Sequence, residues 1–167
     1  MDQKLRGRIQ SRKMVTGSIT SVGALFYSSS TNRYLFLLRN ATSYSGTWGL
    51  VGGKTNLNET LGDTLKREVQ EEIGYTITTE KIIPIDLFTS DNKQFKYNTY
   101  VIVVAEEFVP KLNAEHRGYC WCELSDVPRP IHPGVAGTMK VSEIQDKLNR
   151  SEEHTSELQS HHDLVCR

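Results

Sequence analysis

The chain has 167 residues, of which 37% are apolar and 24% are charged, so it can bury one compact core and has little room for a second domain. Its formal net charge is zero, and no overall field therefore indicates a nucleic-acid or membrane partner. No apolar run is long enough to span a bilayer, and three cysteines do not form a secreted disulfide framework, so a reducing cytoplasm is the expected location.

The first segment, residues 1–16, is predicted to be a basic N-terminal arm. Asp2 is the one acidic residue in this segment, and the basic residues are Lys4, Arg6, Arg8, Arg12 and Lys13. We interpret the segment as a solvated arm, and attraction of phosphate groups is the alternative. Residues 17–149 are then the folded domain.

Short apolar segments separated by turn residues predict β-strands along this domain. They are residues 19–27, 34–39, 48–51, 82–89, 97–105 and 119–124. Between the third and fourth strands, a helix is predicted from about residue 59 to residue 73, with Asn56 or Asn58 as its N-cap and Gly74 at its end. A last helix is expected within residues 134–148. Strands on both sides of a central helix predict an α/β domain with a mixed sheet covered by helices.

The last segment, residues 150–167, has no hydrophobic period that a domain could use. Its sequence, RSEEHTSELQSHHDLVCR, resembles the conceptual translation of a common DNA-sequencing library adapter over its whole length. We therefore predict a non-native, disordered tail that has no part in the fold or the function. A natural polar tail is the alternative, and it would leave the candidate site unchanged.

The central helix combines an apolar stripe with acidic residues in unusual positions. At about 100° per residue, Leu65, Val69 and Ile73 share one stripe. Glu68 and Glu72 overlap the edge of that stripe and Glu71 lies beside them, so we expect these carboxylates to avoid the solvent-facing side.

This acidic cluster is unfavourable without a counter-charge. The pairs Glu68–Glu72 and Glu68–Glu71 bring like charges together at i,i+4 and i,i+3, which costs roughly 0.2–0.5 kcal/mol for each pair. All three residues also lie in the last turns before Gly74, where the helix dipole disfavours carboxylates by roughly 0.3–1 kcal/mol each. A hard divalent cation such as Mg²⁺ or Mn²⁺ prefers oxygen ligands and would offset this charge. The sequence therefore predicts a metal site.

Residues 53–75, GKTNLNETLGDTLKREVQEEIGY, resemble the Nudix box. Gly53 is followed after five residues by Glu59, and after seven more by Arg-Glu-Val, a Glu-Glu pair and Gly74. Tyr75 departs from the pattern at a position that is usually aliphatic, and Val51 stands before the box where proline is common. The resemblance implies a Nudix fold, an α/β/α sandwich with a mixed β-sheet.

The resemblance also implies roles for individual residues. The metal ligands would be Glu68, Glu71, Glu72 and the carbonyl of Gly52, whose missing Cβ also allows close approach of a ligand. Glu68 would bind metal or act as the general base. The catalytic set implied in this way is Glu68, Glu71, Arg67 and Glu115.

The candidate roles of Arg67, Glu115 and Arg39 each have an alternative. Arg67 would orient the carboxylates by pairing with Glu59, and a purely structural ion pair is compatible with that role. Glu115, in a polar loop, would be a base or an additional ligand, or a solvated loop charge. Arg39, at a strand end, would contact a substrate phosphate or form an ordinary ion pair. His116 is interpreted as a loop residue. Tyr44, Phe95 and Tyr97 are candidates for stacking on a base, with packing as the alternative.

The implied activity is hydrolysis of the diphosphate linkage in a nucleoside diphosphate derivative, with Mg²⁺ or Mn²⁺ as cofactor. The expected partner is a small-molecule nucleotide derivative. A non-catalytic Nudix-fold nucleotide-binding module is the alternative from a different class. An RNA-cap pyrophosphohydrolase would share the chemistry, and the basic arm is its only indication. The oligomeric state stays open between monomer and homodimer.

Overall fold

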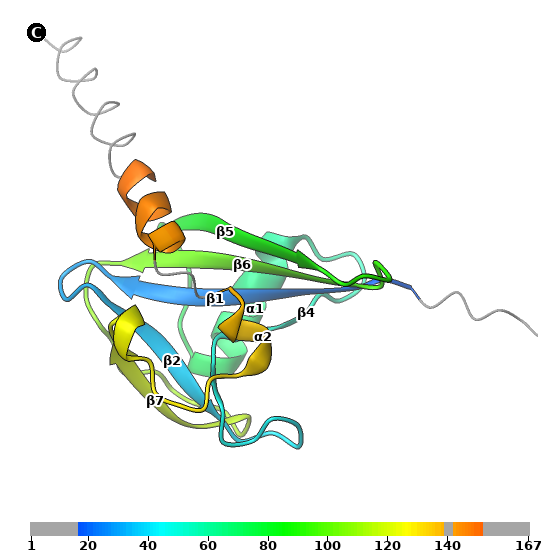
Figure 1. Cartoon of the computed structure of the whole chain (residues 1–167), viewed down its shortest axis with the longest axis horizontal. Helices are drawn as coiled ribbons and strands as arrows, with labels where there is room; N and C mark the ends of the chain where they lie inside the picture. Colours follow the sequence, from blue (N-terminus) through cyan, green and yellow to red (C-terminus); the bar gives the residue numbers. More distant parts are fainter. Residues whose placement is uncertain (1–16, 139–141, 152–167) are drawn as a thin grey trace, which may run out of the picture.

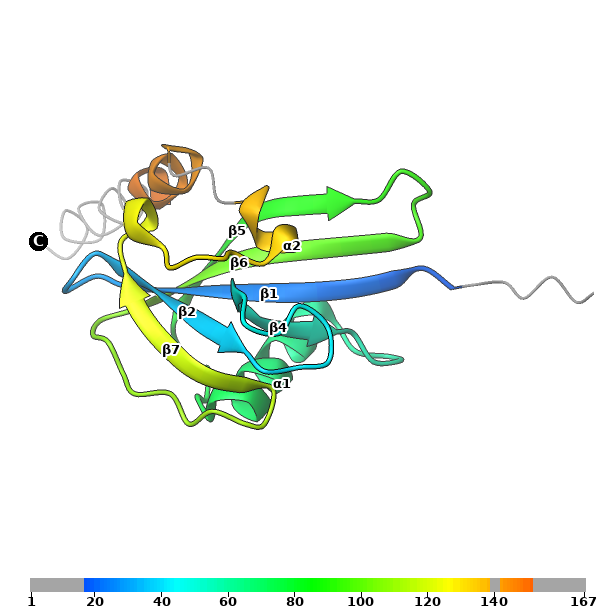
Figure 2. The ribbon, with the colours of Figure 1, turned by 60° about the horizontal axis from the view of Figure 1, so that its bottom comes forward.

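The structure is a computed structural model that describes residues 17–138 and 142–151. The predicted basic arm and the tail beyond residue 151 lie outside these residues. The described part is a seven-stranded sheet covered by helices on both faces (Figures 1 and 2). No described helix combines the length and hydrophobicity that a membrane crossing requires.

The sheet is mixed, as the sequence predicts. The strands are β1 (Ile19–Ser28), β2 (Arg33–Arg39), β3 (Trp48–Gly49), β4 (Val51–Lys54), β5 (Lys81–Thr89), β6 (Phe95–Val104) and β7 (His116–Cys122). Their order is β3-β2-β1-β6-β5, with β4 paired to β1 and β7 paired to β2. Only the β1–β6 strand pair is parallel among the described strand pairs.

Strand β1 is the central strand and changes partner along one of its edges. It pairs with β4 through Ser21 to Ala24 and with β2 through Tyr27 and Ser28. The sheet therefore divides into two branches at this edge. One branch is β4, and the other is β2 with its partners β3 and β7. The candidate site lies where the two branches separate.

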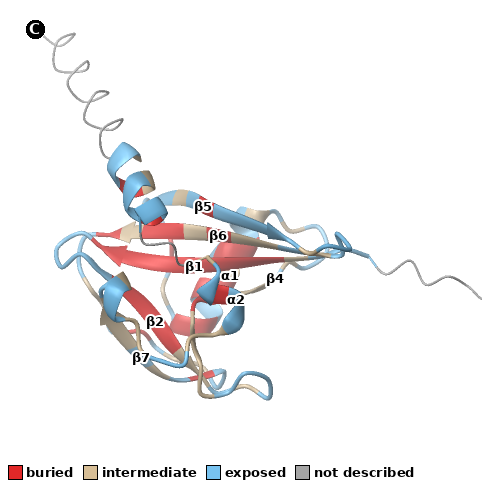
Figure 3. Cartoon of the chain, viewed as in Figure 1, coloured by how far each residue is buried: buried red, intermediate tan, exposed pale blue. Residues whose placement is uncertain are grey.

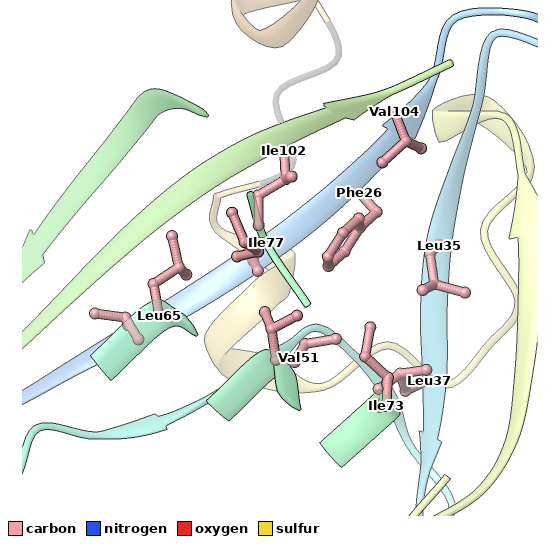
Figure 4. Close-up of a cluster of buried hydrophobic side chains, with 12 residues drawn as sticks. Phe26, Leu35, Leu37, Val51, Leu65, Ile73, Ile77, Ile102 and Val104 are labelled. Atoms are coloured by element: carbon pink, nitrogen blue, oxygen red, sulfur yellow. The ribbon is translucent and has the colours of Figure 1, made fainter. Parts of the chain in front are cut away.

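Two hydrophobic cores lie on the two faces of the sheet. The first packs under α1 (Leu61–Ile73) and contains alternate residues of β1: Val22, Ala24 and Phe26 (Figure 4). The second lies on the opposite face, where Leu25 and Tyr27 pack against α2 (Pro133–Ala136) and the helical residues 142–151. Because successive strand residues point to opposite faces, β1 is buried along most of its length (Figure 3).

This arrangement confirms the predicted α/β/α sandwich. The predicted apolar stripe of the central helix is also confirmed, since Leu65, Val69 and Ile73 are buried in the first core. Tyr75 packs there as well, with ring centroids 5.2 Å from Phe26 and 4.5 Å from Phe108.

The start of the central helix differs from the prediction. Helix α1 begins at Leu61, two residues after the predicted start, and its N-cap is Thr60 rather than Asn56 or Asn58. The Thr60 hydroxyl accepts a hydrogen bond from the Asp63 backbone, and the Asp63 carboxylate accepts one from the Thr60 backbone. This reciprocal capping box satisfies two backbone donors, whereas a single Asn cap would satisfy one.

Other boundaries shift by a few residues. Strand β7 begins at His116 instead of residue 119, because its pairing with β2 continues to Arg39 through a bulge. The predicted last helix is present as α2 and as residues 142–151, which carry Ile144 and Leu148 into the second core. This helix includes residues 150 and 151, so regular structure crosses the predicted start of the tail.

Candidate active site

Two of the three predicted carboxylates turn inward from the last turns of α1. Glu72 is 2% exposed and Glu68 is 9% exposed, although both are acidic. The Gly52 backbone N–H donates to the Glu72 carboxylate over 3.3 Å. The helix therefore directs these side chains at β4, and the capping box and the apolar stripe fix its orientation.

Burial dominates the electrostatics of Glu72. Burial is the largest of the causes that together raise the pKa of the carboxyl group to about 9, and the nearby charges of Glu115 and Glu68 contribute to the rise. The Gly52 hydrogen bond acts in the opposite direction and is outweighed. In the absence of a cation, Glu72 is therefore protonated at neutral pH, and a bound cation would reverse this preference.

Arg67 connects the acidic residues to the loop before the helix. Its Nε and Nη2 atoms donate to the two Glu59 oxygens over 2.6 and 3.0 Å, and Nη2 also donates to the Lys54 carbonyl. Its Nη1 donates to Glu68 over 2.7 Å and to Glu71 over 3.3 Å. The Arg67 hydrogen bonds lower the pKa of Glu59 to about 2. The predicted Arg67–Glu59 pair is therefore present, and the same side chain positions Glu68.

Glu71 does not follow the prediction that all three carboxylates avoid solvent. Its side chain is 56% exposed, and its ion pair with Arg67 is its connection to the acidic group. Glu71 points from α1 in a different direction from Glu68 and Glu72, because it lies farther around the helix from the apolar stripe. The side chains of the first core therefore do not cover it. Its predicted roles as metal ligand and catalytic residue stay predictions.

Pairing between β2 and β7 brings further predicted residues to this group. Arg39 is the Cα partner of His116, and the Asn40 backbone donates to the Glu115 carbonyl over 2.7 Å. The negative charge of Glu115 helps to raise the pKa of Glu72, so the two carboxyl groups are electrostatic neighbours. The structure therefore brings Arg39 and Glu115 from distant parts of the sequence to the carboxylates of α1.

His116 is a site residue that the sequence interpretation missed. It is the buried first residue of β7, and its Nδ1 lies 3.8 Å from the Glu72 carboxylate. Among the described residues, this nitrogen has no hydrogen-bond partner. Burial, together with the positive charge of Arg39, lowers the pKa of the His116 ring. No periodic pattern marks this residue, because its burial depends on the register between β2 and β7.

Tyr97 also reaches the site, across the central strand. A Cβ at Gly23 would overlap the Tyr97 hydroxyl, so the phenol end lies directly over this glycine. Gly23 is in turn the Cα partner of Gly52. Burial raises the pKa of Tyr97 to about 12, and the negative charge of Glu72 contributes.

The two glycines before the helix have different requirements. A Cβ at Gly52 would overlap the backbone carbonyl of Val22, whereas a Cβ at Gly53 would overlap the Glu68 carboxylate. We therefore expect Gly52→Ala to destabilise the fold, because the Val22 backbone in the neighbouring strand cannot move away from the new methyl group. We expect Gly53→Ala to displace the Glu68 side chain and to leave the melting temperature nearly unchanged. Thermal unfolding and turnover measured on both variants would test this. Equal losses of stability in the two variants would contradict the assignment.

The group suits a hard cation chemically. Glu68, Glu72 and Glu115 offer several carboxylate oxygens close to one another, which is the ligand type that a hard cation prefers. Within residues 17–138 and 142–151, no three His, Cys, Asp or Glu side chains converge into a preformed metal centre. The Arg67 guanidinium group donates to Glu68 and so fixes where that carboxylate lies beside Glu72.

Comparisons with known proteins agree with this geometry. A family model of the NUDIX domain matches residues 17–141. Over 100 residues the chain is 32% identical to a putative 8-oxo-dGTP diphosphatase 3 of Mycobacterium tuberculosis, covering 56% of this chain and 45% of that protein. Over 94 residues it is 27% identical to the nucleoside triphosphatase NudI of Escherichia coli, covering 50% of this chain and 67% of that protein. The chain thus spans about half to two thirds of these relatives.

Solved structures show the same fold. The MutT protein from Methanosarcina mazei Go1 superposes with a TM-score of 0.62 at 26% sequence identity. The superposition covers 78% of this chain and 96% of the archaeal protein. At 78% of the chain, the likeness extends well beyond the central helix.

Proposed function

The chain belongs to the Nudix family, and we propose that it hydrolyses the diphosphate linkage of a nucleoside diphosphate derivative in a reaction that depends on Mg²⁺. The observation that carries this proposal is the buried Glu72 carboxyl group, surrounded by Glu68, Glu115 and the Gly52 backbone. Ionising a carboxyl group buried this deeply is costly without a counter-charge, and among the described residues Glu72 forms no ion pair with Lys or Arg. A cation-binding role explains its presence.

We assign the cation to Glu72, Glu68, Glu71 and the Gly52 carbonyl. When bound, the cation supplies Lewis acidity to the diphosphate and a lower pKa to the attacking water. Mn²⁺ has similar ligand preferences and is expected to substitute. Arg67 holds Glu68 and Glu71 in place from the opposite side and so limits the reorganisation that binding requires.

We assign proton transfer from the attacking water to Glu115. The Glu68 carboxylate already accepts a hydrogen bond from Arg67, and Glu72 is enclosed, so neither is well placed to receive a proton from a mobile water. Glu115 is exposed and lies next to Glu72, at the open side of the group. Its loop position allows it to meet a substrate that enters from solvent.

We assign phosphate binding to Arg39. Its Nε donates to the Ser43 carbonyl over 2.8 Å, which fixes the plane of the guanidinium group. Arg39 is the Cα partner of His116, and its positive charge acts to lower the pKa values of His116, His132 and Tyr97. A planar cation at this place can offset the charge of the diphosphate.

The proposal is tested with the full-length chain and a panel of nucleoside triphosphates and nucleoside diphosphate sugars. With Mg²⁺, we expect a nucleoside monophosphate product from at least one compound, loss of that product on addition of EDTA, and recovery with excess Mg²⁺. Chromatography of the nucleotides reports the reaction. Turnover that survives thorough chelation would refute the metal assignment. Binding of a nucleotide without any product, measured by calorimetry, would instead favour a non-catalytic module.

A further inference from the structure

The His116 ring and the Glu72 carboxyl group are enclosed together at the end of α1. Their side chains are 4% and 3% exposed, and the His116 Nδ1 atom lies 3.8 Å from the Glu72 Oε2 atom. An ordinary N–H···O hydrogen bond is about 2.9 Å long, so this contact falls short of one. Among the described residues, Nδ1 has no hydrogen-bond partner, although the atom is buried. Buried polar atoms are nearly always paired, so this nitrogen requires an explanation.

Backbone hydrogen bonds hold these two residues in a fixed relation. The Asn113 backbone N–H donates to the Glu72 carbonyl over 3.1 Å, and the His116 backbone N–H donates to the Asn113 carbonyl over 3.3 Å. Asn113 thus connects the end of α1 to the start of β7. Across the sheet, His116 is the Cα partner of Arg39, at the bulge in the β2–β7 pairing. The main chain therefore holds the ring beside the carboxyl group.

Gly52 and His116 approach the same oxygen atom of Glu72. The Gly52 backbone N–H donates to Oε2, and the Nδ1 atom of His116 faces this oxygen as well. A carboxylate oxygen has two lone pairs, so Oε2 can accept a hydrogen bond from both groups. Two donors on one oxygen would fix the plane of the carboxylate and leave Oε1 for a cation.

We propose that His116 is a positioning residue for Glu72, and that its Nδ1–H donates to Oε2 and orients the carboxylate toward the bound cation. This inference rests on the proposed metal assignment and adds a residue that is not itself a ligand. A hard cation prefers oxygen to imidazole nitrogen, so we assign the ring to the carboxylate rather than to the cation.

The chemistry of the ring suits this role. A neutral imidazole carries its proton on one nitrogen, and an acceptor beside Nδ1 selects that nitrogen. A shift of about 1 Å would convert the 3.8 Å contact into an ordinary hydrogen bond. Carboxylates that bind metals are commonly held by such hydrogen bonds, and their loss typically weakens metal binding by about tenfold to a hundredfold.

The test replaces His116 in the full-length chain with side chains that differ in the position of their donor. His116→Asn places an amide N–H near the Nδ1 position, His116→Gln places it near the Nε2 position, and His116→Leu has no donor. Binding of Mn²⁺ to the metal-free protein is measured without substrate, from the electron paramagnetic resonance signal of the free ion. We expect His116→Leu and His116→Gln to weaken Mn²⁺ binding by about tenfold to a hundredfold. His116→Asn should retain most of the wild-type affinity.

Thermal unfolding in EDTA distinguishes positioning from packing. Leucine is apolar and replaces a buried nitrogen that has no partner, so His116→Leu should melt no lower than the wild type in EDTA. Mn²⁺ at a fixed concentration should then raise its melting temperature less than that of the wild type. His132→Leu is the matched control, because His132 is a half-buried histidine that caps α2 instead of facing Glu72. It should bind Mn²⁺ as the wild type does.

The proposal is overturned if His116→Leu and His116→Gln bind Mn²⁺ as tightly as the wild type, or if His116→Asn loses as much affinity as they do. A fall in the EDTA melting temperature that parallels the loss of Mn²⁺ binding would also overturn it, because the ring would then serve packing. Glu72→Gln is measured beside these variants. If Glu72→Gln loses Mn²⁺ binding and the His116 variants keep it, this inference fails and the proposed function stands. If the wild type binds no Mn²⁺, both fail.

Discussion

Replacing Glu72 with glutamine is expected to lower the rate of Mg²⁺-dependent hydrolysis by about two to three orders of magnitude, while raising the melting temperature of the metal-free protein at pH 8. The loss of rate follows because a bound metal contributes several kcal/mol to the transition state, and about 1.4 kcal/mol corresponds to a factor of ten. Glutamine keeps the shape of the side chain and offers one neutral oxygen in place of a carboxylate. Steady-state kinetics with and without added Mg²⁺ measure this effect.

The gain in stability follows from the same buried carboxyl group. Its pKa is about 9 in the folded protein, compared with an ordinary value of 4.5. Between these pH values the folded state holds a proton that the unfolded state has released, so the free energy of unfolding falls as pH rises from about 4.5 to 9. Glutamine has no proton to lose. The two proteins should therefore melt at similar temperatures near pH 4.5, and the variant should melt higher at pH 8 in EDTA.

Metal addition should reverse that order. Mg²⁺ is expected to raise the melting temperature of the wild type and to have little effect on the Glu72→Gln variant, because a ligand that binds only the folded state stabilises it. Glu71→Gln serves as the control for stability in EDTA, since its side chain is 56% exposed. A Glu72→Gln variant that turns over normally, or that loses activity through unfolding, would disprove the assignment.

Replacing Arg67 with alanine is expected to lower kcat by about tenfold to a hundredfold, the usual effect of removing a residue that orients metal ligands. Arg67 donates to Glu59, Glu68, Glu71 and the Lys54 carbonyl. Its removal takes away the hydrogen bonds that position Glu68 and Glu71. It also removes the contacts with Glu59 and the Lys54 carbonyl that hold the loop before α1 against the helix. Kinetics and thermal unfolding should both report a loss, and Arg67→Lys should recover only part of it, because an ammonium group cannot span these acceptors.

The stability difference between wild type and Arg67→Ala should depend on pH. The pKa of Glu59 is lowered to about 2 by its hydrogen bonds with Arg67, so the pairing is present above the ordinary pKa of 4.5. It is lost as pH falls toward 2, and the two melting curves should converge over that range. Lys66→Ala, an exposed neighbour on the same helix, is the control and should match the wild type at every pH. A constant difference down to pH 2 would show that the Glu59 pairing does not stabilise the loop.

Most elements of the fold were accessible from local patterns. The central helix has a stripe at helical spacing, and the strands are short apolar segments between turn residues, so their existence follows from periodicity and turn chemistry. The N-cap was predicted wrongly because several nearby residues can cap. Thr60 is selected by the Asp63 carboxylate, which completes the reciprocal pair. The sequence contains that pattern, since a threonine stands three residues before an acid.

The carboxylates of α1 were also identified from the sequence, but their surroundings were not. Helical spacing correctly placed Glu68 and Glu72 beside the apolar stripe. It could not predict how much of the Glu71 side chain stays exposed, because that depends on which other elements pack against α1. The interpretation of His116 as a loop residue was wrong, because its side chain becomes buried only when β7 continues its pairing with β2.

The sequence alone established the helix, its acidic cluster and the resemblance to the Nudix box, because these depend on neighbours within a few turns of the chain. Only the tertiary structure decided which distant residues join them. Pairing of β2 with β7 places Arg39 beside His116, and pairing of β1 with β4 and β6 places Tyr97 over Gly23 beside Gly52. The physical reason is that strand register arises from the burial of both sheet faces at once. No short segment carries that information.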